Sequence, residues 1–415
     1  MTTAPAPRIA VIGAGPGGLT CARILQRHGI AVTVHDRDHG PDTRDQGGTL
    51  DLHEDNGQLA LRAAGLLDDF FRLARPEGQE MRQLDAATGE IGFHHVPEEG
   101  ERLKPEIDRG RLRDLLLGSL EPGTVRWNHA LRSVEGPAGG PRRLHFADGT
   151  TTEADLVIGA DGAWSKVRRA LSPAAPVHTG FSFLEAWFHD VDRRHPELAA
   201  LVGPGSASAA DGERGLFAQR CGGDHIRVYV IQRVPADWIS AAGHTVRDTD
   251  ALRALLLDRY RDWSPRLRRL LTDNDGPYVD RPIHALPVPH TWQHDGAATL
   301  LGDAAHLMPP LGVGVNLAML DACELALAIV EHATVAEAVR AYEATMLPRS
   351  AAMQHRLDGA VEGLLSLEPH HGGPEPTEPA GQPEPTGQPE LAGPAELAGP
   401  TEPAGSAELS GAGKR

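Results

Sequence analysis

The chain has 415 residues, 40% of them hydrophobic, which is too long for one simple core and suits two domains. Its net charge of −17 argues against nucleic acid as a main partner, and no apolar run approaches the roughly 20 residues of a membrane span. The three scattered cysteines, Cys21, Cys221 and Cys323, show no metal-ligand spacing, which predicts reduced thiols, no metal and a cytoplasmic setting.

The chain begins with a pattern typical of a βαβ unit. Arg8–Ile12 is a continuous apolar run, as in a buried parallel strand. A glycine-rich turn and a helical pattern over Leu19–His28 follow, and Ala31–Asp36 is a second strand.

The glycines of this turn, Gly13, Gly15 and Gly18, form the pattern G-x-G-x-x-G. The first permits the tight turn, the second lets the backbone approach a pyrophosphate, and the third allows close packing of helix on strand. Asp36 ends the second strand, where an acid can accept hydrogen bonds from a ribose. The motif therefore predicts a bound dinucleotide, without separating FAD from NAD.

The rest of the chain before the tail shows two kinds of sequence pattern. Between about residues 177 and 281, β-rich runs indicate a sheet with one ligand-facing side. Before and after that region, buried strands alternate with helices. We expect helices over Gly57–Ala64, Asp68–Ala74, Arg109–Leu120, Asp250–Tyr260, Val315–His332 and Val335–Leu364, and strands over Asp155–Ala160, Phe181–Phe188, His225–Gln232 and Ala297–Leu301.

The last 47 residues, 369–415, carry a six-residue period in which Glu recurs from Glu378 to Glu408. Pro and Gly supply 19 of these 47 residues, so the segment cannot bury enough apolar surface to offset its ordering entropy. We predict a disordered tail without a catalytic role.

Two further glycine-marked turns follow buried strands. Asp161-Gly162 opens the stretch DGAWSKVR after Asp155–Ala160, and Gly302-Asp303 opens GDAAHLMPP after Ala297–Leu301. Taken singly, Asp161-Gly162 is an ordinary turn, and Asp303 an ordinary turn acid. Three such turns after three buried strands indicate one shared site.

With these three motifs the chain resembles the class A flavoprotein monooxygenases of the aromatic-hydroxylase type, and within them most closely the tetracycline-inactivating flavin monooxygenases. The blocks GGTLDLH and PEIDRGRLR are the more specific part of the resemblance. It implies an FAD-dependent, NAD(P)H-consuming enzyme. Reduced flavin would take up O₂ as a C4a-hydroperoxide and hydroxylate a polycyclic or aromatic small molecule, either a tetracycline-like antibiotic or a polyketide.

The resemblance also implies roles for individual residues. Gly13, Gly15 and Gly18 would hold the FAD pyrophosphate, and Asp303 the ribityl chain. Arg44 matches an NADPH-binding arginine, or is a solvated surface residue. The remaining implied cofactor contacts are Asp36, Arg37, Asp51 and Arg109, together with Gly312, Gly314 and Asn316 at the flavin ring. Asp161 and Arg168 would support this region structurally.

The chain departs from the family pattern in two places. Val313 stands where the family often has Gln, beside the expected flavin ring. In the substrate region Glu185 is the nearest match to a substrate-binding Gln, and a substrate-binding Arg falls near Ser206. Trp187, Phe188 and Phe217 either line an aromatic pocket or form core.

The fold expected is α/β: a Rossmann-like FAD-binding domain interrupted by a β-sheet substrate domain, with a long C-terminal helix and the tail. The FAD-binding domain would comprise 1–75, 104–176 and 280–330, the substrate domain 76–103 and 177–279, and the helix 331–368. We expect a monomer that binds neither nucleic acid nor membrane and uses O₂. Two other functions stay open: a flavin-dependent dehydrogenase or reductase, and a non-enzymatic protein that sequesters a small ligand.

Overall fold

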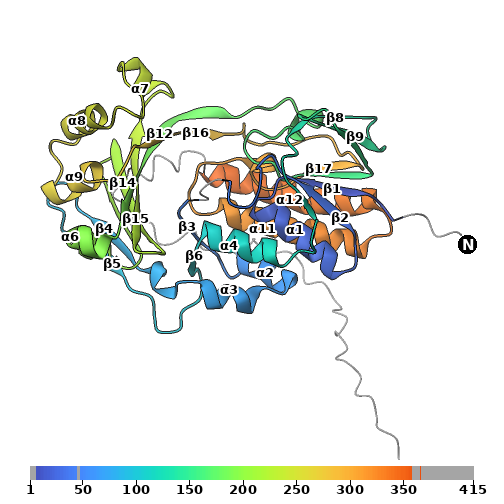
Figure 1. Cartoon of the computed structure of the whole chain (residues 1–415), viewed down its shortest axis with the longest axis horizontal. Helices are drawn as coiled ribbons and strands as arrows, with labels where there is room; N and C mark the ends of the chain where they lie inside the picture. The colour runs from blue at the N-terminus through green and yellow to red at the C-terminus, as the bar shows by residue number, and fades with distance from the viewer. Residues whose placement is uncertain (1–5, 44–46, 358–364, 366–415) are drawn as a thin grey trace, which may run out of the picture. The chain divides into compact units, whose positions relative to one another are not determined.

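The structure is a computed structural model that describes residues 6–43, 47–357 and 365 (Figure 1). These residues belong to one compact unit within residues 1–369. The long hexapeptide tail and residues 358–364, which we expected to continue the last helix, lie outside the described residues.

A five-stranded parallel sheet forms the centre of the cofactor-binding part. Its strands follow the order β17-β11-β1-β2-β7, and every neighbouring pair is parallel. β1 and β11 are buried along their whole length, which explains why their sequences are continuously apolar. The strands are β1 (Ile9–Ile12), β2 (Val32–His35), β7 (Val125–Arg126), β11 (Leu156–Gly159) and β17 (Ala298–Leu300).

Helices cover one face of this sheet, and a small antiparallel sheet covers the other (Figure 1). The helices are α1 (Pro16–Arg27), α2 (Gly57–Ala64), α3 (Leu67–Leu73), α4 (Arg109–Gly118), α10 (Asp303–His306), α11 (Gly314–Glu331) and α12 (Val335–Leu357). The small sheet has the order β10-β9-β8, from β8 (Leu131–Glu135), β9 (Arg142–Phe146) and β10 (Thr151–Ala154). This small sheet was absent from the sequence prediction. Its side chains Leu144 and Phe146 complete the core beneath it.

A seven-stranded sheet forms the second part, in the order β16-β12-β15-β14-β13-β4-β5. All its neighbouring strands are antiparallel except β13 and β4. The strands are β4 (Met81–Leu84), β5 (Ile91–His95), β12 (Val177–His189), β13 (Ser206–Ala210), β14 (Arg214–Cys221), β15 (His225–Arg233) and β16 (Val279–Ala285).

One face of the seven-stranded sheet packs against helices, and this packing fixes which side chains face the other way. Leu184, Ala186 and Val228 alternate into a core with the helices, so Glu185, Trp187 and Arg227 lie on the opposite, front face. The covering helices are α5 (Val191–Arg194), α6 (Pro196–Val202), α7 (Trp238–Ala241), α8 (Thr249–Arg259) and α9 (Pro265–Thr272), and they lie on the far side of the sheet from α11 (Figure 1).

A two-stranded ribbon joins the two parts. It pairs β3 (Thr49–Asp51) with β6 (Glu106–Asp108), next to the 3-10 helix η1 (Pro76–Gln79). The Gln219 side chain on β14 donates to Glu106 Oε1 at 3.1 Å, and the Gly222 amide donates to Asp108 Oδ1 at 2.9 Å. The front face of the seven-stranded sheet is thereby held at the ribbon that carries Asp51.

Several elements agree with the sequence prediction, and the α/β fold class is confirmed. The helices from Gly57, Arg109 and Val335 begin at the expected residues. No helix among the described residues is long and apolar enough to cross a membrane. All three cysteines are buried free thiols.

Candidate functional site

The first glycine turn is held tightly between β1 and α1. Gly13 has φ +110°, and a Cβ there would overlap the carbonyl oxygen of Ala160. A Cβ on Gly18 would overlap the carbonyl oxygen of Gly13. These two glycines are therefore required by packing within the protein, whatever is bound.

Gly15 is different, because the space beside it is open. A Cβ on Gly15 would have no atom within 4 Å. Helix α1 begins at the next residue, and no side chain caps its N-terminus. Uncapped N–H groups and the helix dipole favour an anion at this position. The turn therefore fits a dinucleotide pyrophosphate, and the reason for glycine at position 15 lies outside the protein's own packing.

Asp36 braces this turn from the end of β2. Its Oδ2 accepts a hydrogen bond from the Ala14 amide at 2.6 Å, and Oδ1 accepts one from the Asp38 amide at 2.8 Å. The neighbouring Arg37 is exposed. A carboxylate has further lone pairs, so its contact with a ribose stays a prediction.

Arg113 is a residue of this region that the sequence reading missed. It is buried on α4, donates to the Ala14 carbonyl at 3.4 Å and pairs with Asp38 Oδ2 at 3.4 Å. Its guanidinium also lies 5.3 Å from the Trp127 ring centroid. The available signal was its position four residues after Arg109, on the same face of a helix.

Asp303 and Arg109 are charged side chains without a hydrogen-bond or ion-pair partner among the described residues. Asp303 begins α10 after Gly302, whose φ is +59°, and Arg109 begins α4. Water reaches both side chains, but many protein atoms surround them: the loss of bulk water raises the pKa of Asp303, and lowers that of Arg109. Both groups therefore face a partly enclosed space, where they are available to a ligand.

The start of α11 is tied to the ribbon by Asn316. Its Nδ2 donates to the Asp51 carbonyl at 2.9 Å, and its Oδ1 accepts from the His53 amide at 2.9 Å. The Asp51 carboxylate pairs with His53 Nε2 at 3.0 Å. A Cβ on Gly312 would lie 3.9 Å from Asp51 Oδ2, and one on Gly314 would lie 3.8 Å from Asp303 Oδ1. The residues expected at the flavin ring therefore converge, with the Asn316 side chain used for positioning.

The N-terminus of α11 is a second uncapped helix end at this place. Val313 is its N-cap residue and makes no side-chain hydrogen bond. The Val that departs from the family pattern therefore leaves the first backbone N–H groups of the helix available. Such groups stabilise negative charge near them.

A buried charged network lies behind the Gly302–Asp303 turn. Asp321, on α11, accepts from the Gly302 amide at 2.9 Å, from His306 Nε2 at 2.6 Å and from Arg349 Nη2 at 2.8 Å. Asp321 is fully buried. His306 therefore fixes the segment after this turn to α11.

The second glycine turn, Asp161-Gly162, is also braced from within. Asp161 accepts from Ser165 Oγ at 2.5 Å and from the Lys166 amide at 2.6 Å. Buried Arg168, in the 3-10 helix η2 (Arg168–Ala170), donates to the Ala163 carbonyl at 2.6 Å and to the Ala304 carbonyl at 3.0 Å. These contacts link the second and third glycine turns structurally.

On the front face of the seven-stranded sheet, Glu185 is already saturated by partners. Its carboxylate pairs with Arg227 Nη2 at 2.5 Å and with Arg281 Nε, and accepts from Trp187 Nε1 at 2.8 Å. Burial would raise the pKa of Glu185, but hydrogen bonds from the two arginines outweigh it and lower the pKa. Glu185 therefore organises this face, and direct contact with a substrate stays a prediction.

The aromatic residues of this region divide between core and front face. Phe188 is fully buried in the core under the helices. Phe217 and Tyr229 lie on the front face, opposite each other across β14 and β15. The sequence suggested a substrate-binding arginine near Ser206. Ser206 lies on β13, where it is paired with Gln219 of β14.

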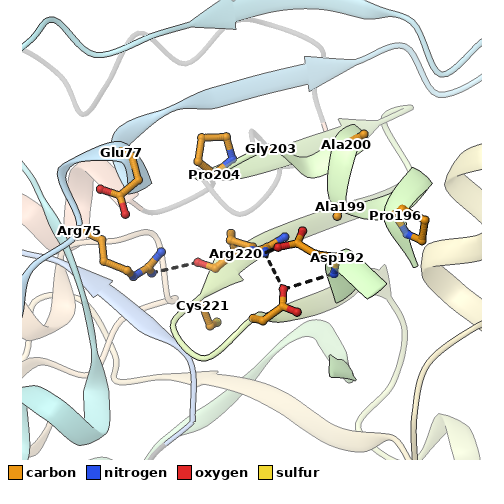
Figure 2. Close-up of a pocket in the computed structure, with 11 residues that line it drawn as sticks. Arg75, Glu77, Asp192, Pro196, Ala199, Ala200, Gly203, Pro204, Arg220 and Cys221 are labelled. Carbon is orange, nitrogen blue, oxygen red and sulfur yellow. Dashed lines mark hydrogen bonds and ion pairs between the residues drawn. The ribbon is translucent and has the colours of Figure 1, made fainter. Parts of the chain in front are cut away.

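A cavity of about 610 Å³ lies elsewhere, between η1, α6 and the β14–β15 turn (Figure 2). Its two arginines and two aspartates already have partners within the protein. Arg220 pairs with Asp192 at 2.8 Å and with Asp224 at 2.6 Å, and Arg75 donates to the Arg220 carbonyl at 3.0 Å. We assign this cavity no part in the site.

The expected contact of Arg44 with NADPH stays a prediction. Arg44 lies outside the described residues. Within the described part of the chain, no group of three His, Cys, Asp or Glu side chains could hold a metal ion.

Glu106 in the ribbon predicts a pH-dependent stability. Its Oε2 accepts from Thr49 Oγ1 at 2.7 Å, and burial together with the nearby Asp51 charge raises its pKa from 4.5 to about 7. The folded state therefore holds a proton that the unfolded state has released, and stability falls as pH rises from about 4.5 to 7. At about 1.4 kcal/mol per pH unit, this costs about 3 kcal/mol.

We expect Glu106→Gln to remove that fall while keeping the side-chain shape. Urea unfolding of both proteins at pH 5 and pH 8 measures it. The variant should be the more stable of the two at pH 8 only. An identical pH dependence in both proteins would contradict the assignment.

Known proteins resemble this chain in sequence and in fold. A family model described as FAD binding domain matches residues 7–254 and 285–356. Monooxygenase penA of Penicillium thymicola is 32% identical over 411 residues, which cover 84% of this chain and 93% of penA. Klebsiella pneumoniae HpxO, solved with FAD and uric acid, has TM-score 0.73 and 22% identity over 87% of this chain and 90% of its own. Tetracycline destructase Tet(55) has TM-score 0.66 and 21% identity, over 86% of this chain and 89% of its own.

Proposed function

Because this chain belongs to the FAD binding domain family, that of the class A flavin monooxygenases, we propose that it hydroxylates an aromatic or polycyclic small molecule, such as a polyketide or a tetracycline-like antibiotic. It is an FAD-dependent monooxygenase, with NAD(P)H as co-substrate. The C4a-hydroperoxide route and the substrate itself are part of the proposal.

The observation that carries the proposal is the convergence of two helix N-termini with two charged side chains, Asp303 and Arg109. Among the described residues, no side chain caps either helix end and neither charge has a hydrogen-bond or ion-pair partner. Gly15 and the start of α1 would receive the FAD pyrophosphate. Asp303 would accept hydrogen bonds from the ribityl hydroxyls, and Arg109 would meet the cofactor from the opposite side. The start of α11, at Gly314, would stabilise negative charge on the reduced ring.

When bound and reduced by NAD(P)H, FAD supplies the activation of O₂. The protein's own part is to bind, orient and exclude water. Asn316 and Asp321 fix the two segments around the ring position. The front face of the seven-stranded sheet, with Phe217 and Tyr229, would hold the substrate facing the ring. We propose no acid or base on the protein for the oxygen transfer.

The direct test is the visible spectrum of the purified full-length protein, followed by NADPH addition under air. We expect a flavin spectrum that bleaches faster when an accepted aromatic substrate is present. Mass spectrometry with ¹⁸O₂ should show one labelled oxygen in the product, first with tetracyclines and then with polyphenolic polyketides. Turnover without label would favour a dehydrogenase or reductase, and a colourless protein that cannot be reconstituted would favour a ligand-sequestering protein.

Asp303→Ala should weaken FAD binding by about 10- to 100-fold, since it removes charge-assisted hydrogen bonds worth about 1.5–3 kcal/mol. Equilibrium dialysis of FAD against the reconstituted protein measures the change. The matched control is Asp114→Ala, an exposed aspartate on α4. Equal FAD affinity in the two variants would refute the ribityl assignment.

The remaining expectations extend the same proposal. Arg44 would contact NADPH, and Arg37 the adenosine end of FAD. The two-domain division, with the seven-stranded sheet as substrate domain, is supported by its separate core under α6–α9. The buried reduced cysteines support a cytoplasmic setting.

A further inference from the structure

Arg281 stands out on the front face of the seven-stranded sheet because only one edge of its guanidinium is used. It lies on β16 opposite Phe183, and its Nε pairs with Glu185. Neither Nη atom has a partner among the described residues, and 49% of the side chain is exposed. Its two Nη atoms can therefore donate to both oxygens of a carboxylate, while the Nε contact with Glu185 holds the side chain in place.

The support for Arg281 is rigid and buried. Glu185 and Arg227 have only 3% and 6% of their side chains exposed. The Arg227 guanidinium lies 4.7 Å from the Tyr229 ring centroid and 5.2 Å from that of Trp187. Two guanidinium groups share one carboxylate here, so the cluster keeps one uncompensated positive charge.

Nearby groups do not cancel that charge. Arg109, across from the sheet, lies close enough for Arg227 and Arg281 to lower its pKa, after the larger effect of its burial. The hydroxyl of Tyr229, which faces the same arginines, has no hydrogen-bond partner among the described residues. Among the described residues, Glu185 is the one carboxylate that pairs with Arg227 and Arg281, so the second positive charge of this pair can meet an anionic ligand.

Aromatic side chains lie beside Arg281 on the front face. Phe183 and Tyr229 meet edge to face, with ring centroids 5.9 Å apart. Phe183, Ile231, Ile283 and Leu365 are buried, and the half-buried rings of Phe217 and Tyr229 pack against them. A flat ring could pack on Phe217 and Tyr229 while an anionic substituent reaches Arg281.

We propose that Arg281, held by Glu185, is the anion-binding residue of the substrate site, and that the substrate is an aromatic or polycyclic molecule bearing a carboxylate or an ionised hydroxyl. This inference rests on the proposed function, because the ligand is a substrate only if the protein is a hydroxylase. The binding preference itself can be measured without turnover. Arg281 is a specificity-determining residue in this scheme, and Glu185 is the positioning residue behind it.

The test compares acidic and neutral probes of one shape on the full-length protein. 1-Hydroxy-2-naphthoate and its amide test the carboxylate, and 4-nitrophenol and its methyl ether 4-nitroanisole at pH 8 test the ionised hydroxyl. Binding is followed by tryptophan fluorescence, since Trp187 contacts Glu185 directly, and by the flavin spectrum. Fluorescence keeps the measurement valid in flavin-free protein, so failure of the proposed function and failure of this inference remain distinguishable.

We expect one anionic probe to bind at least tenfold more tightly than its neutral partner, and Arg281→Gln to abolish that preference. Glu185 keeps Arg227 and Trp187 as partners in this variant, so the fold should survive, which thermal unfolding checks. Arg281→Lys should restore only part of the preference, because Lys lacks the planar fork. Arg193→Gln, an exposed arginine on α5, is the matched control and should change nothing.

The pair that shows the preference identifies the anionic group as carboxylate or ionised hydroxyl. Equal binding of charged and neutral probes, no binding of any probe, or a preference that survives in Arg281→Gln would each overturn the inference.

Discussion

A Gly15→Ala protein should unfold at nearly the same urea concentration as the unaltered chain and yet bind FAD about 10- to 100-fold more weakly. The added methyl group meets no protein atom within 4 Å, and the backbone of Gly15 is extended at φ −83° and ψ 176°, which suits any residue. The methyl group would instead occupy the space through which a pyrophosphate approaches the turn. FAD fluorescence quenching measures the affinity, and urea unfolding of the flavin-free protein measures stability.

Gly18→Ala is the matched contrast in the same motif. Its methyl group would overlap the carbonyl oxygen of Gly13 and also lie 3.2 Å from the Ala160 methyl group, so strand and helix must separate. We expect a loss of about 1–3 kcal/mol from the free energy of unfolding, together with the loss of FAD. Unchanged FAD affinity in Gly15→Ala would remove the pyrophosphate from this turn, however Gly18→Ala behaves.

This pair shows what the sequence could predict and where it stopped. The pattern G-x-G-x-x-G predicts a separate role for each of its three glycines, but its spacing does not say which atoms each glycine contacts. The structure separates Gly13 and Gly18, which the protein's own packing requires, from Gly15, which that packing leaves free. The strands beside these turns were predictable for a simple reason: they are buried on both faces, and their sequences are apolar throughout.

The substrate face was less predictable, because its contacts depend on strand register. Glu185 meets Arg227 and Arg281 across 42 and 96 residues of chain. A shift of one residue in the pairing of β12 with β15 would turn Glu185 into the helix-covered core. No local pattern marks such a pairing. The small sheet β8–β10 was missed because its strands have only four or five residues, and because β8 and β10 do not alternate between buried and exposed side chains as β9 does.

Asp321→Ala should be the most destabilising of the substitutions considered, by about 3–5 kcal/mol. Its carboxylate, fully buried, is the shared acceptor for the Gly302 amide, His306 Nε2 and Arg349 Nη2. Removing it leaves two cationic groups without this acceptor in the interior. FAD affinity should fall as well, because the Gly302 amide belongs to the turn that presents Asp303. Urea unfolding measures the first effect, and FAD titration the second.

The control is Asp258→Ala on α8, whose side chain is 79% exposed and pairs with Arg261 at 3.4 Å. Such an exposed pair contributes under about 1 kcal/mol, so this variant should unfold like the unaltered chain. If Asp321→Ala proved equally stable, the buried network would carry no net stability, and the Gly302–Asp303 turn would have to be held by other contacts.

The same network sets a direction for pH dependence. Burial alone would lower the pKa of His306, but the charge and hydrogen bond of Asp321 outweigh it and raise that pKa above 6.5. The stability gained from protonated His306 is therefore complete below pH 6.5 and is lost as pH rises through the raised pKa. Asp321→Asn keeps the shape and removes the charge, so its unfolding free energy should lack this alkaline decline. A decline of equal size in the variant would show that His306 is neutral in the folded protein and that Asp321 acts there by hydrogen bonding alone.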